Sequence, residues 1–243
     1  MPKSRTRQKT IQRPKPSSST TFSPKDRSGP ALVTTYDEIY RRADALETLT
    51  PGMDLLNDHY LLPSSRVLDL GSGIADPVFL ARAGHSVIAM DLSPTAVRRL
   101  NQVSHAERLD LSGRLKDITH GLPQGPFDII MMMAVSHHLT PEQFAALIDQ
   151  VKASIIPSGY AYVRLMDANS YFATLTDWRE HYFCAGEAEI ESLFPGWQIV
   201  FRLTNEVAAF GSTKHINTYT VALLRCPHPA ILKPYRGSGP TAF

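Results

Sequence analysis

The sequence has little cysteine and no long apolar segment. Its 243 residues include two cysteines, Cys184 and Cys226, and neither belongs to a Cys-x-x-Cys pair. Two cysteines in a chain of this size make no disulfide framework, so a reducing, cytoplasmic location is expected. No metal site is expected either. No apolar run approaches the ~18 residues of a membrane-spanning helix. The first residues also lack the apolar core of a secretory signal, so no membrane contact is expected.

Acidic residues are almost absent from residues 1–29. This segment has eight Lys and Arg residues and one Asp, whereas the rest of the chain has 17 basic and 22 acidic residues. Because it is rich in Ser and Pro and has almost nothing apolar to bury, we expect a disordered basic tail. A transit peptide and a weak contact with nucleic acid or another partner are alternative roles. One domain is expected over residues 30–227, with a flexible tail over residues 228–243.

Short apolar segments alternate with helical patterns along the remaining chain. Several of these segments are continuous apolar runs, which are typical of strands buried on both faces of a parallel sheet. The last two segments are separated by a loop and favour an antiparallel finish. The pattern predicts a Rossmann-like, doubly wound α/β fold with a seven-stranded, mainly parallel sheet, an antiparallel last strand and helices on both faces. The expected strands are residues 66–70, 86–90, 114–118, 127–134, 159–166, 197–203 and 218–224.

Helix-start signals follow three of the expected strands. Each is a capping residue followed by proline: Asp76-Pro77, Ser93-Pro94 and Thr140-Pro141. Thr140 also forms a capping box with Gln143, and Gly84 predicts the end of the first of these helices. Further helices are expected over residues 36–59, with a break near Pro51-Gly52, and near residues 187–194.

The segment VLDLGSGIADP, residues 67–77, is a strand that ends in a glycine turn ahead of a helix. In doubly wound sheets such a turn lies at the carboxyl edge, where nucleotides bind. The dinucleotide fingerprint requires Gly or Ala at position 76. Asp76 instead places a carboxylate at the helix N-terminus, where it competes with a pyrophosphate for the positive end of the helix dipole. The sequence therefore disfavours a dinucleotide.

Two further carboxylates indicate the ligand. Asp91 ends the second strand, and its two oxygens suit the two hydroxyl groups of a ribose. Asp69 lies inside an otherwise apolar strand, which is unfavourable unless the carboxylate has a partner. A ligand with a ribose, an ammonium group and no phosphate accounts for Asp69, Asp76 and Asp91 together.

With these residues the sequence resembles the class I S-adenosylmethionine-dependent methyltransferases. The resemblance lies in VLDLGSG, AMDLSPTAV, LKDITHGLP, FDIIMMMAVSHHL and IIPSGYAYV, in this order. One departure is Ala75, where many members have a third glycine, and alanine is tolerated there if φ stays negative. The resemblance implies S-adenosylmethionine as cofactor, with Asp117 facing the adenine amine. The cofactor-binding residues that it implies are Asp69, Gly71, Ser72, Gly73, Asp91, Leu92, Asp117, Ile118 and Ala134.

Methyl transfer from a sulfonium is an SN2 reaction, so the protein mainly has to align the acceptor and exclude water. A general base is needed where the acceptor carries a proton. His138 and His215 are the candidate catalytic residues. The candidate substrate-pocket residues are Tyr36, Tyr40, His137, Trp178, Arg179 and His181, and the two tyrosines are expected to close over the cofactor as a lid.

The C-terminal third is similar to the tellurite-resistance methyltransferase family, which methylates chalcogen oxyanions and has a His-Arg pair near its last loop. The similarity lies in Phe183, Gly186-Glu187, Trp197, Asn205-Glu206 and His215. Here His215 is followed by Ile216, and the missing guanidinium weakens bidentate recognition of an oxyanion. The tellurite substrate is therefore not expected to apply here. A small-molecule acceptor is expected, because the sequence shows no second large domain to hold a macromolecule.

Two other functions remain open at this stage. An RNA or protein methyltransferase would use the basic tail as an electrostatic tether, although AVSHH replaces the Asn/Asp-Pro-Pro-Tyr tetrad of base-amine methyltransferases. A non-catalytic domain would bind S-adenosylmethionine or a partner only. Intact first and second motifs argue against it.

Overall fold

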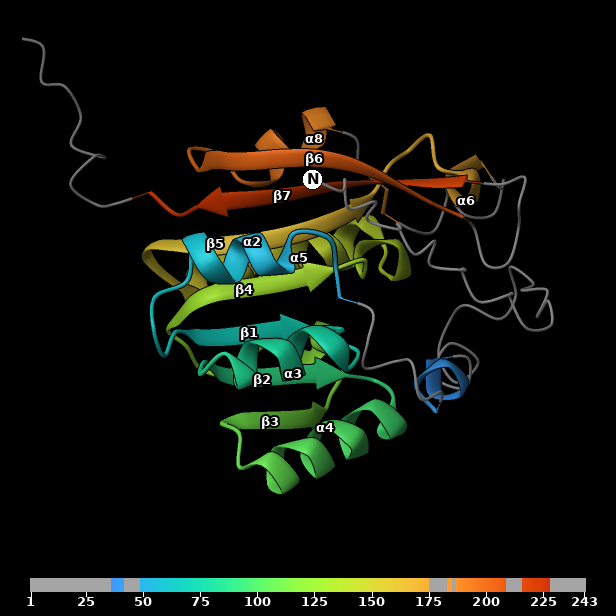
Figure 1. Cartoon of the computed structure of the whole chain (residues 1–243). Helices are drawn as coiled ribbons and strands as arrows, with labels where there is room; N and C mark the ends of the chain where they lie inside the picture. Colours follow the sequence, from blue (N-terminus) through green and yellow to red (C-terminus); the bar gives the residue numbers. More distant parts are fainter. Residues whose placement is uncertain (1–35, 42–48, 175–182, 185–186, 209–215, 228–243) are drawn as a thin grey trace, which may run out of the picture.

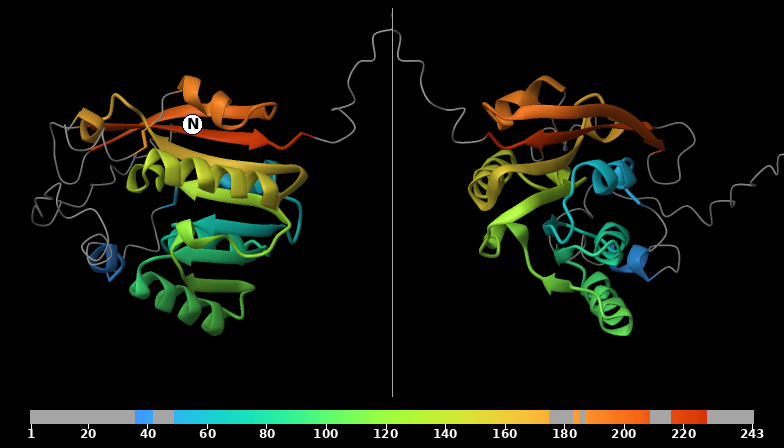
Figure 2. Two further views of the ribbon diagram at one scale, coloured as in Figure 1. Left: turned by 180° about the vertical axis from the view of Figure 1, so that it is seen from behind. Right: turned by 60° about the vertical axis from the view of Figure 1, so that its left-hand side comes forward.

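The computed structural model has a seven-stranded sheet between two layers of helices (Figures 1 and 2). It describes residues 36–41, 49–174, 183–184, 187–208 and 216–227. The strand order is β3-β2-β1-β4-β5-β7-β6, and β7 runs antiparallel to both of its neighbours. This confirms the predicted fold class. The strands are β1 Arg66–Leu70, β2 Ser86–Asp91, β3 Leu111–Leu115, β4 Phe127–Met133, β5 Ile155–Met166, β6 Gln198–Ala208 and β7 Ile216–Arg225.

One face of the sheet is covered by α2 (Met53–His59), α3 (Ala75–Arg82) and α4 (Pro94–Glu107), and the other mainly by α5 (Pro141–Ser154). Ile190 of α8 (Glu187–Leu193) joins the same apolar cluster as α5. The remaining helical segments are short: residues 36–40, η3 Ile118–His120, η4 Ser136–His138 and α6 Tyr171–Thr174. Both predicted proline starts at Ser93 and Thr140 are confirmed, with the capping box in place.

Side-chain alternation along the central strands makes two apolar cores. In β1, Leu68 and Leu70 belong to the cluster on the α5 face, whereas Val67 belongs to the cluster under α2, α3 and α4. Because successive side chains point to opposite faces, Asp69 points to the same side as Val67. A carboxylate is thereby buried on the face of the sheet that α2, α3 and α4 cover.

Some sequence predictions are wrong at this level. β5 begins at Ile155 and not at residue 159, and β6 ends at Ala208 and not at residue 203. The third strand covers residues 111–115 and not 114–118, since its register with β2 pairs Val87 with Leu111 and Asp91 with Leu115. Asp76 is not the N-cap of α3. Ile74 takes that position without a side-chain hydrogen bond, and Asp76 lies in the first turn, where its Oδ1 accepts the Thr50 N–H at 2.9 Å.

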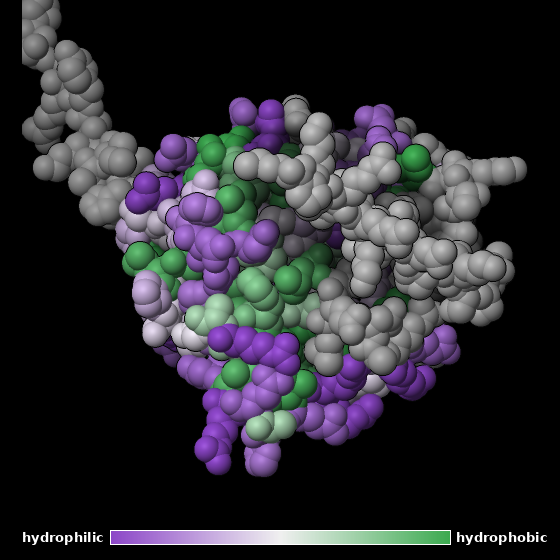
Figure 3. Space-filling view, in the orientation of Figure 1, coloured by the Kyte–Doolittle hydropathy of each residue, from purple (hydrophilic) through white to green (hydrophobic). Residues whose placement is uncertain are grey.

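The surface in the orientation of Figure 1 is polar over α4, while apolar surface gathers over the middle of the view (Figure 3). Large exposed apolar side chains include Leu55 and Leu62. Across the part of the chain that the structure describes, no helix combines the length and apolar character needed to cross a membrane.

Candidate functional site

The carboxyl ends of the parallel strands meet at one edge of the sheet, at the right of Figure 1, and helix 36–40 lies at the same edge. Three connections leave the sheet there: the glycine turn after β1, the turn from β2 into α4, and the turn from β4 into η4. A single edge thus brings together residues from distant parts of the sequence, as expected for a ligand site in a doubly wound sheet.

The glycine turn after β1 is fastened to the end of β2. The N–H groups of Gly71 and Ser72 both donate to the Met90 carbonyl, at 2.8 and 3.0 Å. Gly71 and Gly73 have φ angles of 66° and 58°. A Cβ at Gly71 would lie 2.2 Å from Cγ1 of Val135, so no side chain fits there. Ala75 is not among the residues with positive φ, which agrees with the expected tolerance of alanine.

Asp91 connects the two turns. Its Oδ2 accepts the Gly73 N–H at 2.9 Å and its Oδ1 accepts the Ser93 N–H at 2.8 Å. Burial raises the pKa of this carboxyl group to about 6, against the hydrogen bonds from Ser93 and Gly73. Each carboxylate oxygen can accept a second hydrogen bond, so the predicted contact with ribose hydroxyls fits this geometry. The neighbouring Leu92 is 40% exposed beside it.

Asp69 is the most deeply buried carboxyl group of the site, at 1% exposure. Among the described residues neither of its oxygens has a well-formed hydrogen bond, and the Leu70 N–H alone lies near enough to favour ionisation. Burial, followed by the charges of Asp76 and Asp91, raises its pKa well above the ordinary value. Burial also raises the pKa of Asp76. Three buried carboxyl groups therefore lie together, and within the described ranges none of them is in an ion pair.

The predicted adenine contact lies past the end of β3. Asp117 caps η3, where its Oδ1 accepts both the N–H and the hydroxyl of Thr119, at 2.8 and 2.7 Å. Its second oxygen takes no part in this cap. Ile118 follows as a buried residue. The position beyond the strand end is as predicted, while the adenine contact itself stays a prediction.

The turn after β4 has an unusual backbone. Ala134 has a φ of 63°, a conformation that costs free energy for a residue with a Cβ and that concentrates at functional sites. Its N–H donates to the Arg164 carbonyl at 2.9 Å. This turn directs the chain into η4, which carries Ser136, His137 and His138.

The two histidines of η4 have different surroundings. His137 is 6% exposed, and its ring centroid lies 6.1 Å from that of Tyr219 on β7. His138 is half-buried, with its ring 4.2 Å from His137 and its Nε2 hydrogen-bonded to the Tyr36 hydroxyl at 2.8 Å. Tyr36 in turn stacks on Tyr40 at 5.9 Å. A row of rings therefore runs along the edge from β7 to helix 36–40.

Tyr40 covers the glycine turn. A Cβ placed on Gly73 would lie 3.1 Å from the Tyr40 hydroxyl. Burial, followed by the charge of Asp91, raises the pKa of this hydroxyl well above the ordinary value. The two predicted lid tyrosines thus lie over the site, one on the glycine turn and the other on η4.

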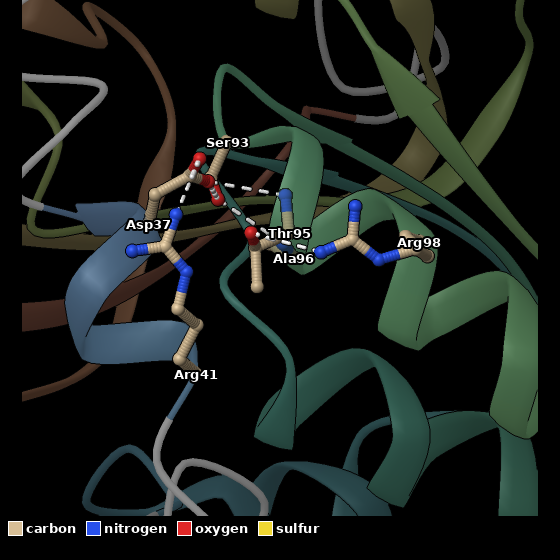
Figure 4. Close-up of polar contacts among 6 residues, drawn as sticks. All are labelled: Asp37, Arg41, Ser93, Thr95, Ala96 and Arg98. Atoms are coloured by element: carbon tan, nitrogen blue, oxygen red, sulfur yellow. Dashed lines mark hydrogen bonds and ion pairs between the residues drawn. The ribbon is translucent and has the colours of Figure 1, made fainter.

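Helix 36–40 is fastened to the start of α4 (Figure 4). Oδ1 of Asp37 accepts hydrogen bonds from the Ser93 hydroxyl and from the Thr95 N–H, the latter at 3.1 Å. Arg99 Nη1 also donates to the Tyr40 carbonyl at 2.5 Å. A carboxylate at a helix N-terminus is stabilised by the unpaired N–H groups there, so Asp37 acts as an additional cap supplied by another helix.

Four predicted site residues lie outside the described residues: Trp178, Arg179, His181 and His215. Two residues at this edge were missed by the sequence analysis, Asp37 and Arg164. Arg164 carried a usable signal, because a charged residue inside the apolar strand GYAYVRLM resembles Asp69 inside VLDLGSG. Asp37 lies in an ordinary amphipathic segment and gave none.

With this geometry, comparison with known proteins identifies the family. The sequence model of the tellurite resistance protein TehB family matches residues 43–217. The chain belongs to this family. An uncharacterised methyltransferase of Synechocystis sp. is 30% identical over 132 residues, which are 51% of this chain and 60% of that protein. The match thus spans less than two thirds of that relative.

Solved structures share the fold of this TehB family member. TehB from Haemophilus influenzae has a TM-score of 0.62 at 18% identity, covering 80% of this chain and 66% of that one. The N-methyltransferase NodS from Bradyrhizobium japonicum, in complex with S-adenosyl-L-homocysteine, has a TM-score of 0.61 at 18% identity, covering 81% and 98%. The resemblance to class I S-adenosylmethionine-dependent methyltransferases and to the TehB family is therefore confirmed.

Proposed function

We propose that this protein transfers a methyl group from S-adenosylmethionine to a small-molecule acceptor. The observation that carries the proposal is the group of buried carboxyl groups Asp69, Asp76 and Asp91, which have no ion pair among the described residues. Such a group is unfavourable alone and is relieved by a cation. It also repels phosphate, which disfavours a dinucleotide.

The residues present fit this cofactor. The Gly71-Ser72-Gly73 turn allows close approach to the backbone, Asp91 suits the ribose hydroxyls, and Asp69 suits the ammonium group. Asp117 and Ile118 would hold the adenine. The cofactor, when bound, supplies the reactive methyl sulfonium. The TehB family match and the methyltransferase relative support methyl transfer.

On the acceptor side we assign the general base to His138, for acceptors that carry a proton. Its Nε2 interaction with the Tyr36 hydroxyl fixes the ring orientation, and the helix that carries Tyr36 excludes water. His215 stays a second candidate from the sequence. A cytoplasmic location belongs to the same proposal and rests on the cysteine content.

A small-molecule acceptor agrees with two related folds. The structure of a Burkholderia thailandensis methyltransferase contains 1,6-didemethyltoxoflavin and S-adenosylhomocysteine, and NodS is described as an N-methyltransferase. The TehB family name refers to tellurite, but Ile216 follows His215 here. We therefore do not expect tellurite to be the substrate, but it belongs among the compounds of an acceptor screen.

The test is calorimetric titration of the whole protein with S-adenosylmethionine, S-adenosylhomocysteine and NADH. We expect micromolar binding of the first two and none of NADH. Failure of S-adenosylmethionine to bind a protein shown to be folded would reject the proposal. An acceptor screen that measures release of S-adenosylhomocysteine then follows.

A further inference from the structure

Arg164 is a half-buried cation at the acceptor side of the site. It lies near the carboxyl end of β5, between Met133 of β4 and Val221 of β7. Its Nε is buried and has no hydrogen-bond partner among the described residues. The described residues also provide no ion pair for its guanidinium. Buried arginines are ordinarily paired, so the N–H groups of Arg164 are available to a ligand.

Tyr219 holds the guanidinium in place. The Arg164 Cζ lies 4.1 Å from the centroid of the Tyr219 ring, and this ring is 9% exposed in β7. Stacking on an aromatic face orients the planar guanidinium without using any of its N–H groups. The donors therefore remain in one fixed plane, which suits a planar carboxylate.

The charges around Arg164 do not fully neutralise its positive charge, so the site can accept an anion. The charge of Asp76 acts on Arg164, but its carboxyl group accepts the Thr50 N–H, and among the described residues the two form no ion pair. Burial lowers the pKa of Arg164, and the neighbouring Tyr219, Asp76 and Tyr162 oppose this effect. The positive charge is thus only partly balanced by the protein itself.

Arg164 interacts electrostatically with Asp76, but its strand position and its contact with Tyr219 favour the acceptor over the cofactor. β5 is separated from β1 by β4, and the guanidinium lies on Tyr219 of β7, one strand farther from the glycine turn. From Tyr219, the rings of His137, His138 and Tyr36 continue toward helix 36–40, with neighbouring centroids 6.1, 4.2 and 5.6 Å apart. Aromatic walls of this kind bind flat rings.

We propose that Arg164, oriented by Tyr219, determines acceptor specificity, and that the acceptor is an aromatic molecule with a carboxylate group. This inference rests on the proposed methyl transfer and deepens it. The carboxylate lies on the guanidinium, while the ring lies against the histidines and places its nucleophilic atom toward the cofactor. The cofactor's own carboxylate has the same chemistry, so the experiment separates these two sources.

The first arm compares two cofactor fragments by calorimetry. S-adenosylhomocysteine has the amino-acid part and 5′-methylthioadenosine lacks it. We expect Arg164→Gln to bind both with unchanged affinity. If this variant loses affinity for S-adenosylhomocysteine alone, Arg164 binds the cofactor's carboxylate and the proposal is overturned. If the unaltered protein binds neither compound, the proposed function itself fails.

The second arm titrates the protein saturated with S-adenosylhomocysteine with benzoate, salicylate and anthranilate and with the amide of each. We expect at least one acid to bind about tenfold more tightly than its amide, since a charged hydrogen bond contributes that much. Arg164→Gln should lose this preference, and Arg164→Lys should keep part of it. Arg225→Gln, which removes an exposed charge at the other end of β7, is the matched control. The absence of any preference for an acid, or its persistence in Arg164→Gln, would overturn the proposal.

Discussion

At the level of single residues, the Asp69 carboxylate is expected to lower the stability of the folded protein and to raise its affinity for S-adenosylmethionine. Its buried carboxyl group has no well-formed hydrogen bond among the described residues and lies near two others. Because burial and these neighbours disfavour its charge, the Asp69→Asn protein should unfold at the same temperature as the original or a higher one. Its affinity for S-adenosylmethionine should fall about tenfold, since the ammonium group loses a charged partner.

Thermal unfolding and calorimetry measure both effects of Asp69→Asn. Binding of 5′-methylthioadenosine, which has no ammonium group, should be unchanged. Asp149→Asn removes an exposed partner of Lys152 and serves as the control. Equal loss of both ligands would mean that the glycine turn has been distorted and that Asp69 is structural.

The ionisation of Asp91 predicts a pH dependence of binding. Its pKa is raised to about 6 by burial, with the charge of Asp37 acting in the same direction, and its charge also acts on Asp69 and Tyr40. A carboxyl group whose pKa is raised on folding stabilises the fold at low pH. That contribution is lost as the pH rises through about 6. Ribose binding has the opposite trend, because the ionised form accepts hydroxyl hydrogen bonds more strongly.

Affinity for 5′-methylthioadenosine should therefore rise by about threefold or more as the pH passes the Asp91 pKa. Titrations at several pH values on both sides of this pKa measure the change, and the ligand itself has no group that titrates in this interval. Asp91→Asn should bind weakly and show a flat profile. A flat profile in the unaltered protein would remove Asp91 from the ribose site.

At the level of elements, we expect helix 36–40 to act as a lid whose attachment depends on Asp37. Its carboxylate joins this helix to Ser93 and Thr95 at the start of α4 (Figure 4), whereas Tyr36 reaches η4 and Tyr40 covers Gly73. Asp37→Ala should leave the melting temperature nearly unchanged, because the sheet core is not altered. S-adenosylhomocysteine should dissociate several-fold faster, because the lid opens more often.

Stopped-flow displacement of S-adenosylhomocysteine measures this dissociation rate in the Asp37→Ala protein. Arg41→Gln lies in the same segment and removes only an exposed contact with Asp37 at 3.9 Å, so it should dissociate at the original rate. If both variants dissociate alike, Asp37 does not hold the lid.

Most elements could be predicted from the sequence because their signals are local. The continuous apolar runs of β1, β2 and β4 and the proline caps of α4 and α5 depend on few residues. The start of α3 could not be predicted in the same way, since Thr50, distant in sequence, takes the Asp76 carboxylate from its expected capping role. The bounds of β3 failed for a related reason: its polar sequence LSGRL has no periodic signal, and pairing with β2 decides its register.

The same holds for the site: local motifs predict some of its residues, whereas contacts between residues far apart in the sequence cannot be predicted. The glycine turn, Asp91 and the histidines of η4 follow strand ends and could be found from motifs. The contacts of Asp37 with Ser93, of Tyr36 with His138 and of Arg164 with Tyr219 join residues 55 or more positions apart. No spacing rule predicts such pairs. Of these residues, Arg164 alone had a usable signal, a charge within the apolar sequence GYAYVRLM, and the sequence analysis did not use it.

At the level of the whole molecule, deletion of the basic segment 1–29 distinguishes a small acceptor from a macromolecular one. The motifs that resemble the class I methyltransferases begin at Val67, so deletion of residues 1–29 should change cofactor affinity and turnover of a small acceptor by less than about twofold. An electrostatic tether to RNA would instead make activity depend steeply on salt, because each neutralised phosphate releases counterions. Activity of the full and shortened chains at low and physiological salt measures both effects. A large loss on deletion, together with a steep salt dependence in the full chain, would replace the small acceptor by a polyanion.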